Sequence, residues 1–290
     1  SEPLHTSYRR RRRRRRFYMK NLITRAIFGA IYVAVIAGGI LGGNLPFLLL
    51  MLLLVTLGIN EFLTITVDMG GERRTPSVNS VLLHSLDCVG GGLMVITLWG
   101  GLFVPAAVTF LLYIVLRLSV QLWITRENPL ISLAMSMMSQ LYVALPVALM
   151  SVIYRHSPQM LLLMFVLVWI NDTFAFLTGS MLGRHRLWER ISPKKSWEGF
   201  IGGMVFTVIA AGITPMLFPG YFGMPTAVYA LLGLVVSIAA TAGDLIESLI
   251  KRTLGVKDSG HLIPGHGGIL DRIDSILLVI PAAVIYLSFM

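Results

Sequence analysis

The sequence predicts an all-α polytopic membrane protein with about nine transmembrane helices and a cytosolic N-terminus. Of its 290 residues, 56% are hydrophobic and only 13% are charged, whereas soluble domains carry roughly 25% charged residues. Apolar runs of about 20 residues, the length that crosses a bilayer as a helix, recur along the whole chain. Lysine and arginine also gather at alternate boundaries of these runs, as topogenic charges do.

The apolar runs define nine segments, separated by short polar or glycine-rich breaks. GGNLP separates the first two segments and WGG separates the third from the fourth. The predicted segments are 23–43, 45–67, 81–99, 101–118, 130–154, 159–182, 199–218, 225–247 and 269–289.

Cationic residues orient these segments in the membrane. With the N-terminus inside, every lysine and arginine except Arg155 falls on the inner side. Cytoplasmic flanks carry such an excess, so we expect loops 183–198 and 248–268 to face the cytosol. We divide the chain into N-terminal transmembrane helices (19–158) and a C-terminal transmembrane region (159–290) with these two loops, in which we expect the functional residues to lie.

The arginine run Arg9–Arg16 supplies eight of the 24 cationic residues. A basic run can indicate nucleic-acid binding, but before an apolar segment it more often marks a cytoplasmic flank. We predict no nucleic-acid partner, and we interpret residues 1–18 as a basic extension or an added leader.

Acidic residues in and next to the C-terminal cassette, which we define as Ser248–Asp274, are spaced so that their side chains can point toward one place. Asp271 and Asp274 are three residues apart, as are Asp244 and Glu247, and this spacing places two side chains on one helical face. Asp244, Asp271 and Asp274 are therefore candidate ligands for Mg²⁺, which favours carboxylates together with phosphate oxygens. Two structural alternatives remain open: a capped helix start at Asp271–Asp274, and a Glu247–Lys251 brace.

Cations and glycines beside these acids suggest phosphate binding. The glycines of PGHGG and the helix start near Ile269 could bring backbone N–H groups to a phosphate. The candidate substrate-binding residues are Lys194, Lys195, Ser196, Arg252, Lys257, Asp258, His266 and Arg272. Alternatively, ISPKKSWEG is a basic membrane collar, the cassette charges are solvated, and His266 braces its loop.

Three further acids lie within apolar segments, where ionisable residues are costly and usually functional. Asp172 is a candidate catalytic residue that either joins the metal cage or holds a lysine of the neighbouring loop. Around Glu61 and Asp87 the sequence shows no converging polar residues, so we interpret both as structural hydrogen-bonding groups.

The cassette also carries a long pattern with many fixed positions: S-x-x-K-R-x₄-K-D-x-G-x₃-P-x-H-G-G-x-x-D-R-x-D. This pattern resembles the signature of phosphatidate cytidylyltransferases, or CDP-diacylglycerol synthases. SPKKSWEG and NDTFAFLTG, at 192–199 and 171–179, are similar to two further motifs of that family. His261 departs from the pattern, since family members often have lysine there.

The resemblance implies an enzyme that transfers CMP from CTP to phosphatidic acid, giving CDP-diacylglycerol and pyrophosphate. It implies Mg²⁺, alone or beside a second ion, and catalytic roles for Asp172, Asp244, Lys251 and Asp271. It also implies a bacterial inner-membrane location among membrane lipids, an active site facing the cytosol, and a homodimer.

Two alternatives fit the sequence less well. A membrane phosphotransferase that consumes a CDP-lipid would show a DG-x-x-AR pattern, which the sequence lacks. An ion-coupled transporter using Asp172 and Asp244 would favour internal repeats or paired broken helices, and would leave the basic loops unexplained.

Overall fold

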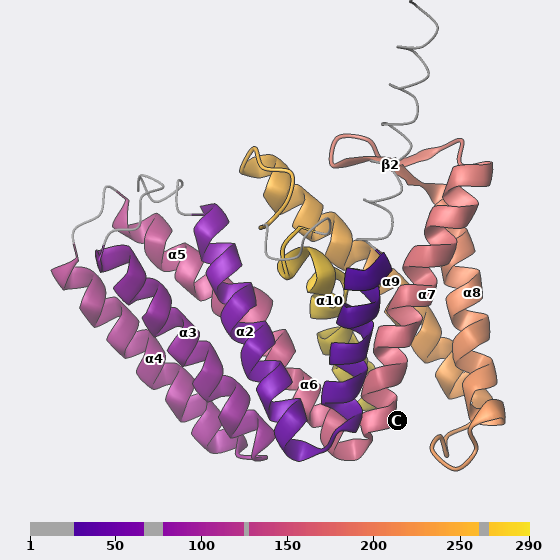
Figure 1. Ribbon diagram of the computed structural model, residues 1–290, viewed down its shortest axis with the longest axis horizontal. Coiled ribbons are helices and arrows are strands. Elements are labelled where there is room, and N and C mark those ends of the chain that lie inside the picture. The colour runs from indigo at the N-terminus through magenta and orange to yellow at the C-terminus, as the bar shows by residue number, and fades with distance from the viewer. Residues whose placement is uncertain (1–25, 67–77, 125–127, 261–266) are drawn as a thin grey trace, which may run out of the picture.

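Helices account for most of the residues that the computed structural model describes, which are 26–66, 78–124, 128–260 and 267–290 (Figure 1). The prediction of an all-α membrane protein is confirmed at this level, and each predicted segment coincides with a helical stretch. In chain order these are Ala26–Leu41, α2 (Asn44–Thr66), α3 (Val78–Trp99), α4 (Phe103–Trp123), α5 (Pro129–Ser139), the π-helix η2 (Gln140–Ala144), α6 (Leu145–His156), α7 (Pro158–Leu182), α8 (Trp197–Leu217), α9 (Thr226–Thr253) and α10 (Leu270–Leu287). The arginine run Arg9–Arg16 lies outside the described residues.

Seven stretches within the described ranges are long and apolar enough to cross a bilayer, with α5, η2 and α6 forming one of them. The helix Ala26–Leu41 is shorter than these, and α10 carries three charged residues near its start. Helices suit the bilayer because they satisfy every backbone polar group internally. The count of nine spans stays a prediction.

The helices form two groups that meet at α6 (Figure 1). In the first group, α3 packs against α2, α4 and α6; in the second, α7, α8, α9 and α10 each pack against the next along the chain. Helix α6 contacts both α7 and α10, so one continuous apolar core runs through Val143, Leu167, Val236 and Ile276. The second group carries most of the candidate site residues.

Glycines let the helices of the second group approach closely, as small residues do in membranes. A Cβ on Gly203 of α8 would lie 2.8 Å from the carbonyl oxygen of Asn171 in α7. A Cβ on Gly243 of α9 would lie 2.7 Å from the carbonyl oxygen of Asp274 in α10. These contacts bring the α7, α9 and α10 acids to one end of the bundle.

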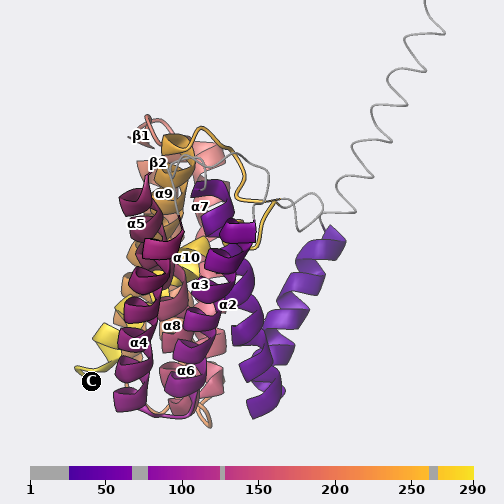
Figure 2. The ribbon, with the colours of Figure 1, turned by 90° about the vertical axis from the view of Figure 1, so that its left-hand side faces the viewer.

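The loop predicted at 183–198 contains a two-stranded antiparallel hairpin, β1 (Arg186–Trp188) and β2 (Ser192–Ser196). The hairpin and the C-terminal cassette lie at one end of the bundle, and the C-terminus lies at the other (Figures 1 and 2). Helix α9 continues to Thr253, several residues beyond the predicted end at 247. Lys251 and Arg252 therefore project from a helix and not from a loop.

A buried polar network ties α3, α4 and α5 together around Asp87. Its carboxylate accepts hydrogen bonds from Tyr113 and Ser136, each 2.7 Å long, and lies 3.3 Å from Nε of Arg117. Asp87 and Arg117 are each 1% exposed, and Gln140 of η2 donates to the Asp87 carbonyl. The structural interpretation of Asp87 is confirmed, but the expectation that nothing converges on it was wrong, and Arg117 is not a flanking cation.

Candidate functional site

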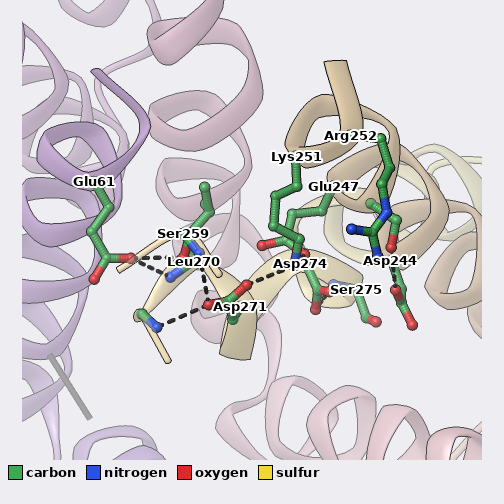
Figure 3. Close-up of polar contacts among 12 residues, drawn as sticks. Glu61, Asp244, Glu247, Lys251, Arg252, Ser259, Leu270, Asp271, Asp274 and Ser275 are labelled. Atoms are coloured by element: carbon green, nitrogen blue, oxygen red, sulfur yellow. Dashed lines mark hydrogen bonds and ion pairs between the residues drawn. The ribbon is translucent and has the colours of Figure 1, made fainter. Parts of the chain in front are cut away.

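Lys251 joins two acids from neighbouring helices (Figure 3). Its Nζ lies 2.5 Å from Oε2 of Glu247, one turn earlier in α9, and 2.6 Å from Oδ1 of Asp271 in α10. The predicted Glu247–Lys251 pair is confirmed. Because the same ammonium also holds Asp271, the pair links α9 to the start of α10 and does more than brace one helix.

Asp271 is held on both carboxylate oxygens. Oδ1 contacts Lys251, and Oδ2 accepts hydrogen bonds from the backbone N–H groups of Ser259 at 3.0 Å and Gly268 at 2.9 Å. Its side chain is only 7% exposed. The arrangement fixes the conformation of the cassette around one charged group, since hydrogen bonds to a carboxylate are stronger than neutral ones.

The hairpin places one lysine directly against one acid of α9. Nζ of Lys195 lies 2.7 Å from Oδ2 of Asp244, whereas Lys194 is exposed. The Ser196 hydroxyl is buried and accepts a hydrogen bond from the Gly199 N–H, 3.1 Å away, so it caps the N-terminus of α8. Of the three predicted residues here, Lys195 is the one that the structure brings to the acids.

Three carboxylates from three helices repel one another at this end of the bundle. Asp274 in α10 interacts unfavourably with Asp244 in α9 and Asp172 in α7, and Asp172 also interacts with Asp244. The spacing argument that placed Asp271 and Asp274 toward one spot is supported, because both line one cavity of about 310 Å³. Asp172 lines it too.

That cavity combines an apolar wall with a charged end. Phe28 and Val33 of the helix Ala26–Leu41 and Val168 of α7 line it together with the acids, and Arg272 of α10 lines it as well. The Tyr32 hydroxyl donates a 3.0 Å hydrogen bond to the Arg272 carbonyl oxygen. The space therefore has an apolar part that suits a hydrocarbon chain, and a charged end with three carboxylates and one guanidinium, where an anionic group would need a cation beside it.

The predicted Mg²⁺ ligands are of a chemical type that suits the ion, but their side chains are not close enough together to bind it as a group of three. Carboxylates are suitable ligands, and the mutual repulsion of Asp172, Asp244 and Asp274 would be relieved by a cation. No three His, Cys, Asp or Glu side chains among the described residues are placed to hold a metal together, however. Asp271 would in addition have to exchange the Lys251 ammonium for the ion.

The N–H groups at the start of α10 are bonded to the protein's own carboxylates. Oε1 of Glu61, in α2, accepts from Ile269 N at 2.9 Å, and Oε2 accepts from Leu270 N at 2.9 Å. The Gly268 N–H is bonded to Asp271. The expectation that these amides face a phosphate was therefore wrong for this arrangement, and so was the statement that nothing converges on Glu61.

The remaining candidates lie around this centre or outside the described residues. Nε of Arg252 lies 3.5 Å from the Ile191 carbonyl, a long contact between α9 and the hairpin. Lys257 and Asp258 are exposed on the cassette, while His266 lies outside the described residues. Sequence reasoning missed Glu61 as a partner of the cassette, because a lone acid in an apolar helix does not indicate which distant segment it meets.

Comparisons with known proteins indicate the family. The profile of the Cytidylyltransferase family matches residues 23–290. A phosphatidate cytidylyltransferase of Staphylococcus haemolyticus (strain JCSC1435) is 47% identical over 117 residues, which are 40% of this chain and 44% of that protein. One of Staphylococcus aureus (strain COL) is 50% identical over 119 residues, again 40% of this chain and 44% of that protein. The matched part thus spans less than half the length of these relatives.

Proposed function

The chain belongs to the cytidylyltransferase family, and on that premise we propose that it transfers CMP from CTP to phosphatidic acid. The products would be CDP-diacylglycerol and pyrophosphate. One observation carries the proposal: Lys195 of the basic hairpin meets Asp244 of the acidic cluster at 2.7 Å. Cations suited to phosphates and acids suited to a metal thereby occupy one site.

The reaction needs positioning and charge neutralisation more than a strong base. A phosphate oxygen of the lipid, already an anion, attacks the α-phosphorus of CTP in line, and the bond to the pyrophosphate oxygen breaks. Lys195 of the hairpin and Arg252 of α9 would bind the nucleotide phosphates, and both side chains contact residues where the hairpin meets α9. Arg272 lines the cavity of about 310 Å³, where it would face the lipid phosphate.

The lipid would enter the same cavity from the membrane. Its apolar wall suits acyl chains, and Arg272, Asp172 and Asp274 form its charged end. Exposed apolar side chains of the helix Ala26–Leu41, such as Ile27 and Ile31, face outward as lipid-contacting residues do. The lipid could thus keep its chains in the bilayer while presenting its phosphate.

We include Mg²⁺ in the proposal because the site offers carboxylate oxygens as ligands. Asp244 and Asp274 would hold Mg²⁺ together with nucleotide phosphate oxygens, since the ion commonly takes only one or two carboxylates. When bound, it would neutralise charge on the nucleotide phosphates and the leaving pyrophosphate. We also propose Asp271 as a further metal ligand and a second metal ion beside Mg²⁺.

The proposed membrane topology follows the predicted charge distribution. We place the hairpin and the cassette in the cytosol, where CTP is, because the inner boundaries carry nearly all cations. A bacterial inner membrane, nine spans and a homodimer complete the proposal, and nucleic acid has no part in it.

The decisive experiment measures incorporation of radiolabelled CTP into lipid by the purified protein with phosphatidic acid and Mg²⁺. We expect a labelled liponucleotide and stoichiometric pyrophosphate, both dependent on phosphatidic acid, and a parallel series with dCTP reports sugar selectivity. Label in lipid without added phosphatidic acid, or no label at all, would contradict the proposal.

We expect Lys195→Ala to lower kcat/KM for CTP by about 10- to 100-fold, because it removes a charge-assisted contact inside the site. Lys194→Ala should raise KM for CTP by a smaller factor, since its side chain is exposed. The measurement is initial-rate kinetics with varied CTP.

Arg190→Ala is the matched control, because it removes an exposed cation from the turn of the same hairpin. If all three variants shift the kinetics equally, the hairpin acts only as a basic collar at the membrane surface.

A further inference from the structure

We infer that Glu61 is a positioning residue for the active site: from the N-terminal group of helices, it fixes the start of α10 and thereby Asp271 and Asp274. The inference rests on the proposed function for its kinetic part. Its geometric part rests on three hydrogen bonds between α2 and the cassette, which join residues as far as 209 positions apart in the sequence.

Glu61 binds two separate parts of the cassette (Figure 3). Oε1 accepts from Ile269 N at 2.9 Å, whereas Oε2 accepts from Leu270 N at 2.9 Å and from the Ser259 hydroxyl at 3.3 Å. One carboxylate therefore closes the cassette on itself, with its early part held against the first turn of α10. Removing it leaves two helix-terminal N–H groups without their acceptor.

Electrostatics favours this placement. A helix N-terminus carries a partial positive charge, and a carboxylate there stabilises the helix start. Asp271, next to the capped N–H groups, directs its own carboxylate to Gly268 N and Lys251. Glu61 thus accepts from the N–H groups of Ile269 and Leu270, and Asp271 accepts from that of Gly268. On this inference, the Asp271 side chain keeps its orientation toward Lys251 only while Glu61 is bonded to the neighbouring N–H groups.

Two glycines of the cassette are shaped around Glu61. A Cβ on Gly260 would lie 2.8 Å from its Oε1, and a Cβ on Gly268 would overlap its Oε2 and the Ser259 hydroxyl oxygen. Any larger residue at Gly268 would force the carboxylate away. The cassette therefore fits the Glu61 carboxylate sterically as well as by hydrogen bonding.

The experiment compares Glu61→Gln, Glu61→Asp and Gly268→Ala in the purified full chain. The amide that Glu61→Gln introduces would place an N–H₂ group against a backbone N–H, so one of the helix-terminal bonds is lost. We expect kcat per folded protein to fall by about 10- to 100-fold, because displacement of reacting groups by about 1 Å costs rates of that order. KM for CTP should change less than kcat, since Lys195 and Arg252 have other partners and do not contact Glu61.

Hydrogen exchange supplies a readout that does not depend on activity. In Glu61→Gln, the amides of Ile269 and Leu270 should exchange about 10-fold faster or more, while α3 and α4 keep their protection. Glu61→Asp, which keeps the charge, should recover part of kcat, and Gly268→Ala should reproduce the loss. Asn60→Ala, an exposed neighbour on the same helix, is the matched control and should behave as wild type.

Wild-type kcat in folded Glu61→Gln would overturn the inference. So would loss of protection throughout the bundle, because Glu61 would then be a general brace and not a positioning residue. If the wild-type protein incorporates no CTP, the proposed function fails separately, and the local exchange at Ile269 and Leu270 still decides the geometric part.

Discussion

Asp271→Ala is expected to abolish incorporation of CMP into lipid, with a loss of at least about 100-fold in turnover, while the protein stays folded in the membrane. The carboxylate connects Lys251 to the backbone of Ser259 and Gly268, so its loss releases the centre of the site. Folding should survive because Lys251 retains Glu247. The measurement is radiolabelled CTP incorporation with added Mg²⁺, normalised to folded protein.

Ser288→Ala serves as the control, since this exposed hydroxyl at the far end of α10 bonds only to its own helix at Ile285. Wild-type-like incorporation by folded Asp271→Ala would exclude both the proposed metal role and the positioning role of this carboxylate.

Lys251→Met should lower turnover by at least about 100-fold and also destabilise the fold. The methionine fills a similar volume but leaves the side chains of Glu247 and Asp271, 2% and 7% exposed, without their shared cation. Breaking a buried ion pair by removing one partner costs roughly 3–5 kcal/mol. The free energy of unfolding in detergent and the incorporation rate should therefore both fall.

A double variant separates the two roles of Lys251. Adding Glu247→Gln to Lys251→Met removes the unpaired charge of α9, so much of the lost stability should return, while turnover stays low. Thr253→Ala, an exposed helix-end residue bonded only to Leu249, controls for changes at this end of α9. Recovery of turnover together with stability would show that Lys251 is only a brace.

Hydrophobic runs predicted the helices well because the bilayer permits few alternatives: about 20 apolar residues must satisfy their backbone internally. Boundaries were less accurate where packing extends a helix past its apolar run. Helix α9 continues through Lys251 to Thr253, since Lys251 is neutralised by Glu247 and Asp271 and does not have to leave the bundle.

Local spacing also predicted part of the site. The i,i+3 relation of Asp271 and Asp274 correctly placed both on one cavity, and the i,i+4 relation of Glu247 and Lys251 correctly predicted their pair. Spacing could not show that Lys195 rather than Lys194 meets Asp244. In the hairpin, adjacent residues point in opposite directions, and its placement over α9 depends on tertiary contacts.

The sequence by itself determined that this chain is a helical membrane protein with an acidic and basic cassette typical of its family, because composition, helical spacing and motif are all local. Only the tertiary structure decided how the cassette is held. Glu61 reaches the start of α10 from 208 residues away, and Asp271 turns from an expected free ligand into the partner of Lys251. Such pairings depend on which helices pack together, and a lone charge in an apolar run does not indicate its partner.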